Sequence, residues 1–258
     1  MKIPDFKWII NKKVIHRRYR YEPKVIGRLK RIHGDTFVDI GAYSGKYSLA
    51  LRKNFRKIVA FEPNSSYVPI IKKATMSYDN ILVEEMAVAN IDGTVTLFPQ
   101  NDDPANVNTI LEEFEVDLAG NPEGKRIHRG KNGVQVRCVT FDTYFQEREI
   151  DLVKIDVEGA EFLVLEGMKK SLATKRVKNI VVELHNVRNR NRLLGLLEKH
   201  FQKINWLGLD HCFASGPNVD LIFDRRLDEA GRLSSSREPT IGICRQDCRD
   251  STGSIAAH

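Results

Sequence analysis

The sequence has few cysteines and no long apolar segment, and both absences narrow what the protein can be. The 258 residues include four cysteines: Cys138, Cys212, Cys244 and Cys248. They form no CxxC pair, so we expect reduced thiols, and we attribute the spacing of Cys244 and Cys248 with His258 to chance. No run approaches the roughly 18 apolar residues that cross a bilayer, and residues 1–21 lack the apolar core of a signal peptide. We therefore expect a cytoplasmic protein.

Acidic residues are nearly absent from the start of the chain. Residues 1–33 contain 11 of the 41 Lys and Arg residues but two of the 34 Asp and Glu residues. The other residues carry 30 basic and 32 acidic groups, so the net charge of +7 belongs to this leading segment. Because the body is nearly neutral, any attraction to a polyanion or anionic membrane must come from the leader. We expect nucleic acid not to be a partner, and peripheral membrane contact through residues 1–33 stays open.

The apolar residues of the leader recur at helical spacing: Ile3, Phe6, Ile9, Ile10 and Val14. Such a helix has three possible positions. It can dock on the parent domain, lie on a membrane surface, or cover the mouth of an active site. Docking is the commonest of these outcomes, and we expect it here.

From Thr36 onward, short apolar runs alternate with amphipathic stretches, as in a parallel sheet with helices on both faces. The sequence thus predicts one α/β domain over residues 34–224. Its predicted strands cover residues 36–40, 57–61, 80–84, 151–156, 178–184, 202–207 and 218–223. Its predicted helices cover residues 45–53, 64–76, 159–172 and 188–200.

Three further segments interrupt or follow this alternation. Residues 84–98 predict an inserted hairpin with a tight Asp92-Gly93 reversal, and another extended run follows at 134–139. Between them, residues 99–133 are rich in polar residues and helix breakers, which is typical of a lid, a binding loop or a partly disordered insertion. Residues 225–258 predict a tail that is disordered after about residue 232.

The first chemical signal is a strand that runs into a glycine turn and then a helix, in the segment VDIGAYSGKYS. Gly41 permits a tight turn and the close approach of a ligand, and Gly45 lets the helix begin near the sheet. Asp39 ends the strand, where it can accept hydrogen bonds from a ligand amine or from the loop. Two glycines also occur in purely structural strand-to-helix turns, so the loop by itself leaves both interpretations open.

The second signal is an acid at the end of the next strand. Glu62 follows the glycine loop by roughly 20 residues, the position from which a carboxylate binds both hydroxyls of a ribose. Pro63 ends the strand and favours helix entry. A pyridine dinucleotide enzyme uses the same two features, so they predict an adenosine-type ligand rather than a particular reaction.

The third signal is a group of acids where a strand meets a helix. Asp156, Glu158 and Glu161 lie within six residues, more than a helix cap alone requires. In the strand that follows, Glu183 and His185 share one side because strand side chains alternate. His185 is therefore expected at the same sheet edge as Asp156.

In combination these segments resemble the FkbM family of methyltransferases from about Thr36 to Asn186. The resemblance rests on VDIGAYSGKYS, VAFEPN, NILVEEMAVANIDGTVTLF, CVTFDTYF, DLVKIDVEGAEFLVLEG and IVVELHN in family order. It implies methyl transfer rather than hydride transfer, a Rossmann-like class I methyltransferase fold with a seven-stranded, mostly parallel sheet, and S-adenosylmethionine as the donor. The acceptor it implies is usually a hydroxyl on a small molecule, sugar or glycan.

The resemblance also implies roles for individual residues. Asp39, Gly41 and Gly45 would shape the methionine side of the donor pocket, and Ala42 and Tyr43 of the same loop would also bind the donor. Glu62 would hold the ribose, and Ala87 and Val88 would lie near the adenine. Asp156 and Glu158 would face the transferable methyl group.

A hydroxyl acceptor benefits from a positioned base, and His185 is the first candidate because its ordinary pKa lies near neutrality. Asp156 is the second, with Glu158 and Glu183 orienting the acceptor or the imidazole. We expect no metal, although Asp156, Glu158 and His185 could instead hold a divalent ion that binds acceptor hydroxyls. The competing function is a non-catalytic cofactor-binding or nucleic-acid-associated module that uses the basic leader. The sequence leaves the oligomeric state open.

Overall fold

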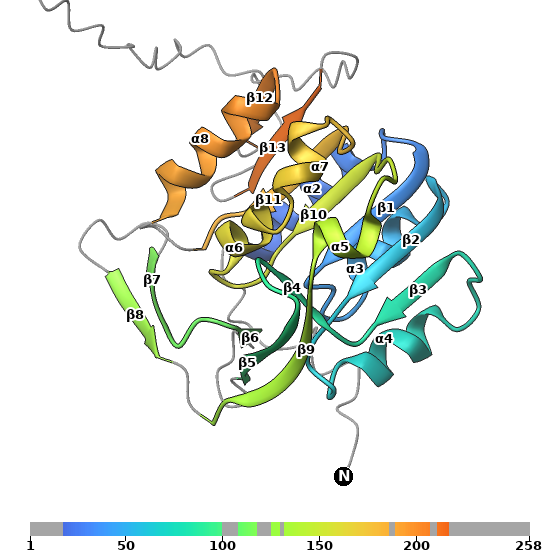
Figure 1. Ribbon diagram of the computed structural model, residues 1–258. Helices are drawn as coiled ribbons and strands as arrows, with labels where there is room; N and C mark the ends of the chain where they lie inside the picture. Colours follow the sequence, from blue (N-terminus) through green and yellow to red (C-terminus); the bar gives the residue numbers. More distant parts are fainter. Residues whose placement is uncertain are drawn as a thin grey trace, which may run out of the picture. The chain divides into compact units, whose positions relative to one another are not determined.

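The structure is a computed structural model that describes residues 18–99, 108–117, 125–129, 132–185, 189–206 and 211–216 (Figure 1). All of these residues belong to one compact unit, residues 1–221. The predicted tail at 225–258 and the predicted strand at 218–223 lie outside the described residues.

The unit is built on a seven-stranded sheet with the order β12-β13-β11-β10-β1-β2-β3. Its strands are β1 (Gly34–Ile40), β2 (Phe55–Phe61), β3 (Ile81–Glu84), β10 (Leu152–Ile155), β11 (Asn179–Glu183), β12 (Lys203–Trp206) and β13 (His211–Ser215). Strand β13 runs antiparallel to both of its neighbours, and the strands from β11 to β3 pair in parallel. This arrangement confirms the predicted Rossmann-like sheet, although residues 211–215 were not predicted as a strand.

The seven helices of the described residues are α2 (Arg18–Leu29), α3 (Lys46–Leu51), α4 (Val68–Thr75), α5 (Phe141–Phe145), α6 (Glu161–Glu166), α7 (Lys169–Ala173) and α8 (Arg190–His200). They cover both faces of the sheet (Figure 1). In β1, Val38 belongs to the large core cluster that also contains residues of α5 to α8, whereas the neighbouring Asp39 bonds to α3. Side chains on both faces of the sheet are therefore buried, which explains why the strand sequences are nearly continuous apolar runs.

The described part of the leader is helical and packs on the domain. Val25 and Leu29 of α2 are fully buried, and α2 contacts α3. Helix α2 is therefore docked on the domain, but it follows the segment for which the docking helix was predicted, and the docking of that segment stays a prediction. The apolar residues from Ile3 to Val14 lie outside the described residues, and membrane contact through residues 1–33 stays a prediction.

The single helix predicted over 159–172 is wrong, because the chain forms α6 and α7 with a break at Gly167 and Met168. At this break the chain contacts a neighbouring strand. A Cβ on Gly167 would overlap the carbonyl oxygen of Ala89, so the chain approaches β4 (Ala87–Ala89) more closely than a residue with a side chain would allow.

The hairpin predicted over 84–98 is also wrong. Strands β4 and β5 (Gly93–Pro99) lie on opposite sides of β9 (Val134–Thr140), in a second sheet of order β4-β9-β5-β6 that includes β6 (Asn108–Thr109). The carboxylate of Asp92 accepts hydrogen bonds from the Thr140 amide and the Thr143 hydroxyl. The predicted turn therefore wraps around the end of β9 instead of closing a hairpin.

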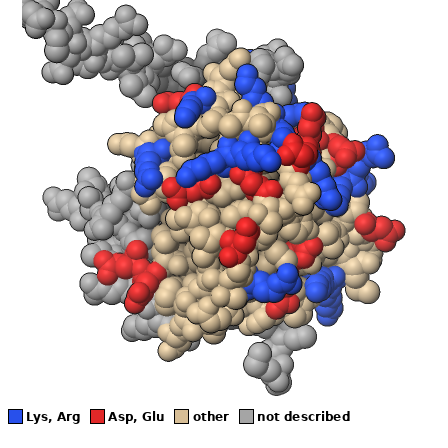
Figure 2. Space-filling model, viewed as in Figure 1, with Lys and Arg blue, Asp and Glu red and all other residues tan. Residues whose placement is uncertain are grey.

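Part of the polar stretch 99–133 is ordered into strands. Besides β6, it contains the antiparallel pair β7 (Glu113–Asp117) and β8 (Lys125–Arg129). On the face that Figure 2 shows, Lys and Arg side chains lie among Asp and Glu side chains, consistent with a body of nearly balanced charge. Within the described ranges, no helix combines the length and the apolar character that a membrane span needs.

Candidate functional site

The predicted site residues follow the carboxyl ends of neighbouring strands, and the sheet brings these ends together. The amides of Gly41 and Ala42, after β1, both donate to the carbonyl of Phe61 at the end of β2, at 3.0 and 2.9 Å. On the other side of β1, the amide of Asp156 donates to the Ile40 carbonyl at 3.1 Å. The loops that follow β1, β2 and β10 are therefore bonded to one another at one edge.

The glycine loop adopts backbone conformations that favour glycine. Gly41 and Gly45 have φ angles of +78° and +71°, and Tyr43 between them has φ +50°. A Cβ on Gly41 would overlap the carbonyl oxygen of Asp156. The expectation that Gly41 permits a tight turn is confirmed, and the group that it approaches closely here is the backbone of Asp156, directly after β10. The close approach of a ligand stays a prediction.

Asp39 is fully buried, and its carboxylate contacts groups inside the protein. Its Oδ2 accepts hydrogen bonds from the Ser48 hydroxyl at 2.7 Å and the Ser48 amide at 3.2 Å, while Oδ1 lies 3.4 Å from Lys154 Nζ. The carboxylate thereby fixes the first turn of α3 against β1. The backbone group that donates to Asp39 thus belongs to α3 and not to the loop that was expected, and a bond to a ligand amine stays a prediction.

Glu62 is 4% exposed and lies directly behind the loop. Its Oε2 accepts a hydrogen bond from the Tyr43 amide at 2.8 Å, and its Oε1 accepts one from the Asn64 amide at 2.9 Å. Burial raises the pKa of Glu62 to about 7, against the lowering effect of these two amides. Because this pKa lies near neutral pH, the protonation state of Glu62 can change when a polar ligand binds against its carboxyl group.

Ala87 and Val88, the expected adenine contacts, are 5% and 3% exposed. Ala87 packs in a small apolar cluster with Cys138, and Val88 packs in the large core cluster. Their side chains are thus used for packing, and their place near an adenine stays a prediction.

Lys154 is a buried lysine that the sequence prediction missed. It lies in the middle of β10, directly beside Asp39 in the sheet register, with a side chain that is 6% exposed. Its Nζ donates to the Gly41 carbonyl at 2.8 Å and lies 3.2 Å from Asp156 Oδ2. Burial lowers the pKa of Lys154, but the carboxylates of Asp156, Asp39 and Glu183 outweigh it and hold that pKa above its ordinary value. A single charged lysine thus links the glycine loop to the acid after β10.

The predicted meeting of His185 with the acids is confirmed. Its Nε2 faces three carboxylates, at 3.3 Å from Glu183, 3.5 Å from Glu158 and 3.9 Å from Asp156. Its Nδ1 lies 2.7 Å from Oε1 of Glu161. The imidazole is buried, whereas the side chains of Asp156 and Glu158 are 23% and 21% exposed and form the solvent side of the cluster.

Glu161 differs from the other two acids of the group that the sequence predicts where β10 meets α6. It is 2% exposed and belongs to the interior. Its Oε1 accepts a hydrogen bond from the Gly159 amide at 2.9 Å as well as contacting His185. Glu161 is therefore the residue that orients the imidazole, and Asp156, Glu158 and His185 present a set of atoms that could ligate a metal ion.

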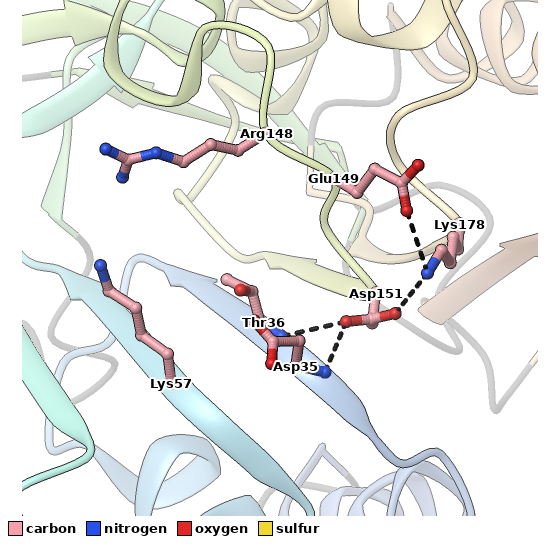
Figure 3. A pocket seen from close by; sticks show the side chains of 7 residues that line it. All are labelled: Asp35, Thr36, Lys57, Arg148, Glu149, Asp151 and Lys178. Carbon is pink, nitrogen blue, oxygen red and sulfur yellow. Dashed lines mark hydrogen bonds and ion pairs between the residues drawn. The ribbon is translucent and has the colours of Figure 1, made fainter.

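A separate pocket lies at the opposite, amino-terminal edge of the sheet (Figure 3). There, Asp151 accepts hydrogen bonds from the amides of Asp35 and Thr36 and from Lys178, which also pairs with Glu149. Lys57 and Arg148 point along its other wall. These contacts tie strand beginnings together, and none of the predicted site residues lies in this pocket.

Comparison with known proteins identifies a family and a curated relative. A family model described as the methyltransferase FkbM domain matches residues 39–212. Methyltransferase sdnD of Sordaria araneosa is 28% identical over 170 residues, which are 57% of this chain and 64% of that protein.

Two solved structures are among those that are similar to the chain. The methyltransferase FkbM from Methylobacillus flagellatus has a TM-score of 0.47 and 14% identity, over 70% of this chain and 43% of its own. An rRNA methylase from Streptococcus thermophilus has a TM-score of 0.42 and 9% identity, over 75% of this chain and 95% of its own. The chain spans less than two thirds of sdnD and of the Methylobacillus structure.

Proposed function

The chain belongs to the family defined by the methyltransferase FkbM domain, and we propose that it transfers a methyl group from S-adenosylmethionine to a hydroxyl of a small molecule, sugar or glycan. One observation carries the proposal. A left-handed glycine loop, the buried acid Glu62 and a histidine surrounded by carboxylates meet at the carboxyl edge of a Rossmann-like sheet. This edge is where parallel α/β sheets bind their ligands.

The donor half of the proposed site consists of the loop and Glu62. The chemistry of these groups fits the donor, because a carboxylate at the end of β2 can accept hydrogen bonds from both ribose hydroxyls. Gly41, Ala42, Tyr43 and Gly45 would form the wall on the methionine side, with Asp39 holding that wall from behind. Ala87 and Val88 would approach the adenine through their backbone. When bound, S-adenosylmethionine supplies a methyl group on a sulfonium sulfur.

The acceptor half would position a hydroxyl and take its proton. Glu161 holds Nδ1 of His185, which leaves Nε2 directed toward the solvent-side acids. In this orientation Nε2 is the first candidate to accept the hydroxyl proton, and Asp156 is the second. Glu158 and Glu183 would orient the acceptor. Much of the remaining barrier is removed by alignment of the hydroxyl oxygen with the methyl group.

The charge of this half favours uncharged acceptors. Four carboxylates surround His185 at its two nitrogens, and they would repel a phosphate or carboxylate placed beside them. We therefore propose a neutral, hydroxyl-bearing acceptor. Further contacts to it are expected from residues 99–133 and from the leader, and much of both lies outside the described residues.

Two measurements test the proposal. Calorimetry should detect saturable binding of S-adenosylmethionine to the full chain, and Glu62→Gln should weaken this binding. A donor with an isotopically labelled methyl group, incubated with metabolite, glycan and RNA extracts, should then yield a labelled neutral hydroxy compound by mass spectrometry. Label in RNA would overturn the acceptor class but not methyl transfer. Donor binding without transfer to any extract would favour a non-catalytic module.

A further inference from the structure

The acids around His185 carry more negative charge than their basic neighbours offset. Glu161 and Glu183 are 2% and 7% exposed, so water screens them poorly. Lys154 is shared between Asp39 and Asp156, so it compensates only part of the charge. A cluster of this composition is stabilised by an additional cation.

Asp156, Glu158 and His185 lie close enough together to share one metal ion. One ligand atom from each of Asp156, Glu158 and His185 lies within 4.8 Å of the others. Two atoms that each lie about 2.1 Å from one ion are separated by about 3 Å at a right angle and about 4.2 Å when opposite. The limit of 4.8 Å exceeds the separation of an opposite pair by about 0.6 Å and that of a right-angled pair by about 1.8 Å, so rotation of the partly exposed Asp156 and Glu158 side chains would complete the site.

The imidazole is also oriented as in metal sites. A metal-binding histidine typically gives its other ring nitrogen to a carboxylate, which fixes the ring and raises its basicity. Nδ1 of His185 has this partner in Glu161, at 2.7 Å, while Nε2 points to Glu158 and Asp156. Asp156 and Glu158 are partly exposed, so an ion can enter from solvent and keep open positions.

We propose that Asp156, Glu158 and His185 form a site for one divalent cation of the Mn²⁺ type, with Glu161 as the residue that positions the imidazole. A donor set of two carboxylates and one imidazole suits ions that accept both oxygen and nitrogen, so Mn²⁺ should bind more tightly than Mg²⁺. Three protein ligands leave positions for the hydroxyl oxygens of an acceptor.

The role of the ion, unlike its binding, rests on the proposed function. An acceptor hydroxyl bound to the ion loses its proton more readily, because the cation stabilises the alkoxide. With Nε2 of His185 engaged as a ligand, the proton would pass to Glu183, which lies 3.3 Å from that nitrogen. The oxygen would then take the methyl group as the carbon–sulfur bond breaks.

The experiment measures metal binding without any turnover. Full-length protein freed of metal by a chelator is titrated with Mn²⁺, and free Mn²⁺ is followed by electron paramagnetic resonance. We expect one site. Glu158→Gln should weaken it at least ~10-fold, and Glu161→Gln should weaken it ~10-fold to 100-fold through loss of the carboxylate that holds Nδ1 of His185. Glu166→Gln is the matched control, because this acid lies at the far end of α6 and contacts Asn90 and Arg192 instead.

Binding of S-adenosylhomocysteine and the thermal unfolding midpoint are measured on the same samples. A variant that keeps its midpoint and product binding but loses Mn²⁺ supports the site. Wild-type protein that binds S-adenosylhomocysteine but no Mn²⁺ overturns the metal site and leaves the proposed function intact. Equal Mn²⁺ affinity in Glu158→Gln and Glu166→Gln overturns it too. Mn²⁺ binding without S-adenosylhomocysteine binding supports the site but contradicts the proposed donor.

Discussion

The α-carbon of Gly41 lies against the backbone carbonyl oxygen of Asp156, so closely that a Cβ on Gly41 would overlap that oxygen. This contact joins the loop proposed to hold the donor to the acid proposed to face the acceptor. Lys154 reinforces it, because its ammonium group contacts the Gly41 carbonyl and the Asp156 carboxylate. The two halves of the site are therefore fixed relative to each other by backbone packing.

Gly41→Ala should disrupt this junction. The new methyl group meets backbone that has little freedom to move, and a φ of +78° is unfavourable for alanine. We expect a loss in unfolding free energy on the order of 3 kcal/mol, measured by urea denaturation, together with loss of donor binding. Gly27→Ala is the control, because a Cβ there meets nothing within 4 Å inside α2, and it should stabilise by about 0.5–1 kcal/mol. Equal effects of the two changes would contradict the contact.

Glu62 should make donor binding depend on pH. Burial raises its pKa to about 7, and ribose hydroxyls donate to its ionised form, so donor affinity should increase from pH 6 to pH 8 and binding should release a proton. Calorimetry in two buffers of different ionisation enthalpy measures this release. Glu62→Gln should bind at least ~10-fold more weakly and without pH dependence. Glu112→Gln, a change at an exposed acid, should behave as wild type.

The same pKa predicts how stability changes with pH. Between the unfolded pKa of 4.5 and the folded pKa of about 7, the folded state keeps a proton that the unfolded state releases. The contribution of Glu62 is thus fully present below pH 4.5 and is lost as the pH rises to about 7, a decline on the order of 3 kcal/mol. Urea denaturation across this range should show a smaller decline for Glu62→Gln. Parallel profiles would refute the raised pKa.

Lys154→Met should destabilise the protein strongly, because it leaves Asp39 buried without its cation. We expect a loss of about 3–5 kcal/mol in urea denaturation. Adding Asp39→Asn should recover part of this loss, since the isolated charge is removed. Lys178→Met provides the control: its ammonium group pairs with Asp151 but is half exposed, so its loss should cost about 1 kcal/mol or less. If adding Asp39→Asn restores none of the unfolding free energy lost in Lys154→Met, the unpaired charge of Asp39 is not the cause of the loss.

Cys138 should be unreactive in the native protein. Burial, aided by the charge of Asp92, raises the pKa of its thiol to about 11, so little thiolate exists at pH 8. Peptide mapping after iodoacetamide treatment should find Cys138 unmodified in native protein and modified in urea. Rapid native labelling would show that the pairing of β9 with β4 and β5 opens readily.

The main sheet was predictable because each of its inner strands is an apolar run that ends at a polar turn. β1, β2, β10 and β11 all lie within one or two residues of their predicted bounds. The second sheet was not predictable, because the sequences of β4 and β5 are typical of two strands that pair with each other in a hairpin. Both strands pair with β9, which begins at Val134, 35 residues after β5 ends at Pro99. Pairing over such a distance leaves no periodic signal in the sequence.

The candidate site was predictable to the extent that it follows strand ends. Gly41, Glu62, Asp156 and His185 lie at the expected edge because a parallel sheet aligns its carboxyl ends. Lys154 was missed, although a lysine inside the otherwise apolar strand LVKI was a usable signal. The burial of Glu161 depends on how α6 packs, which residue spacing does not specify.

The pairing of β5 with β9 bears on how proteins of this family can differ in the stretch between these two strands. Leu97 lies opposite Val134, and Asn108 of β6 lies opposite Pro99, so the second sheet holds both ends of the stretch between β5 and β9. Asn108 also accepts a hydrogen bond from the side chain of Asn64, whose amide donates to Glu62, so the same stretch is joined to the donor half. Exchanging it between relatives should therefore alter donor affinity as well as acceptor choice.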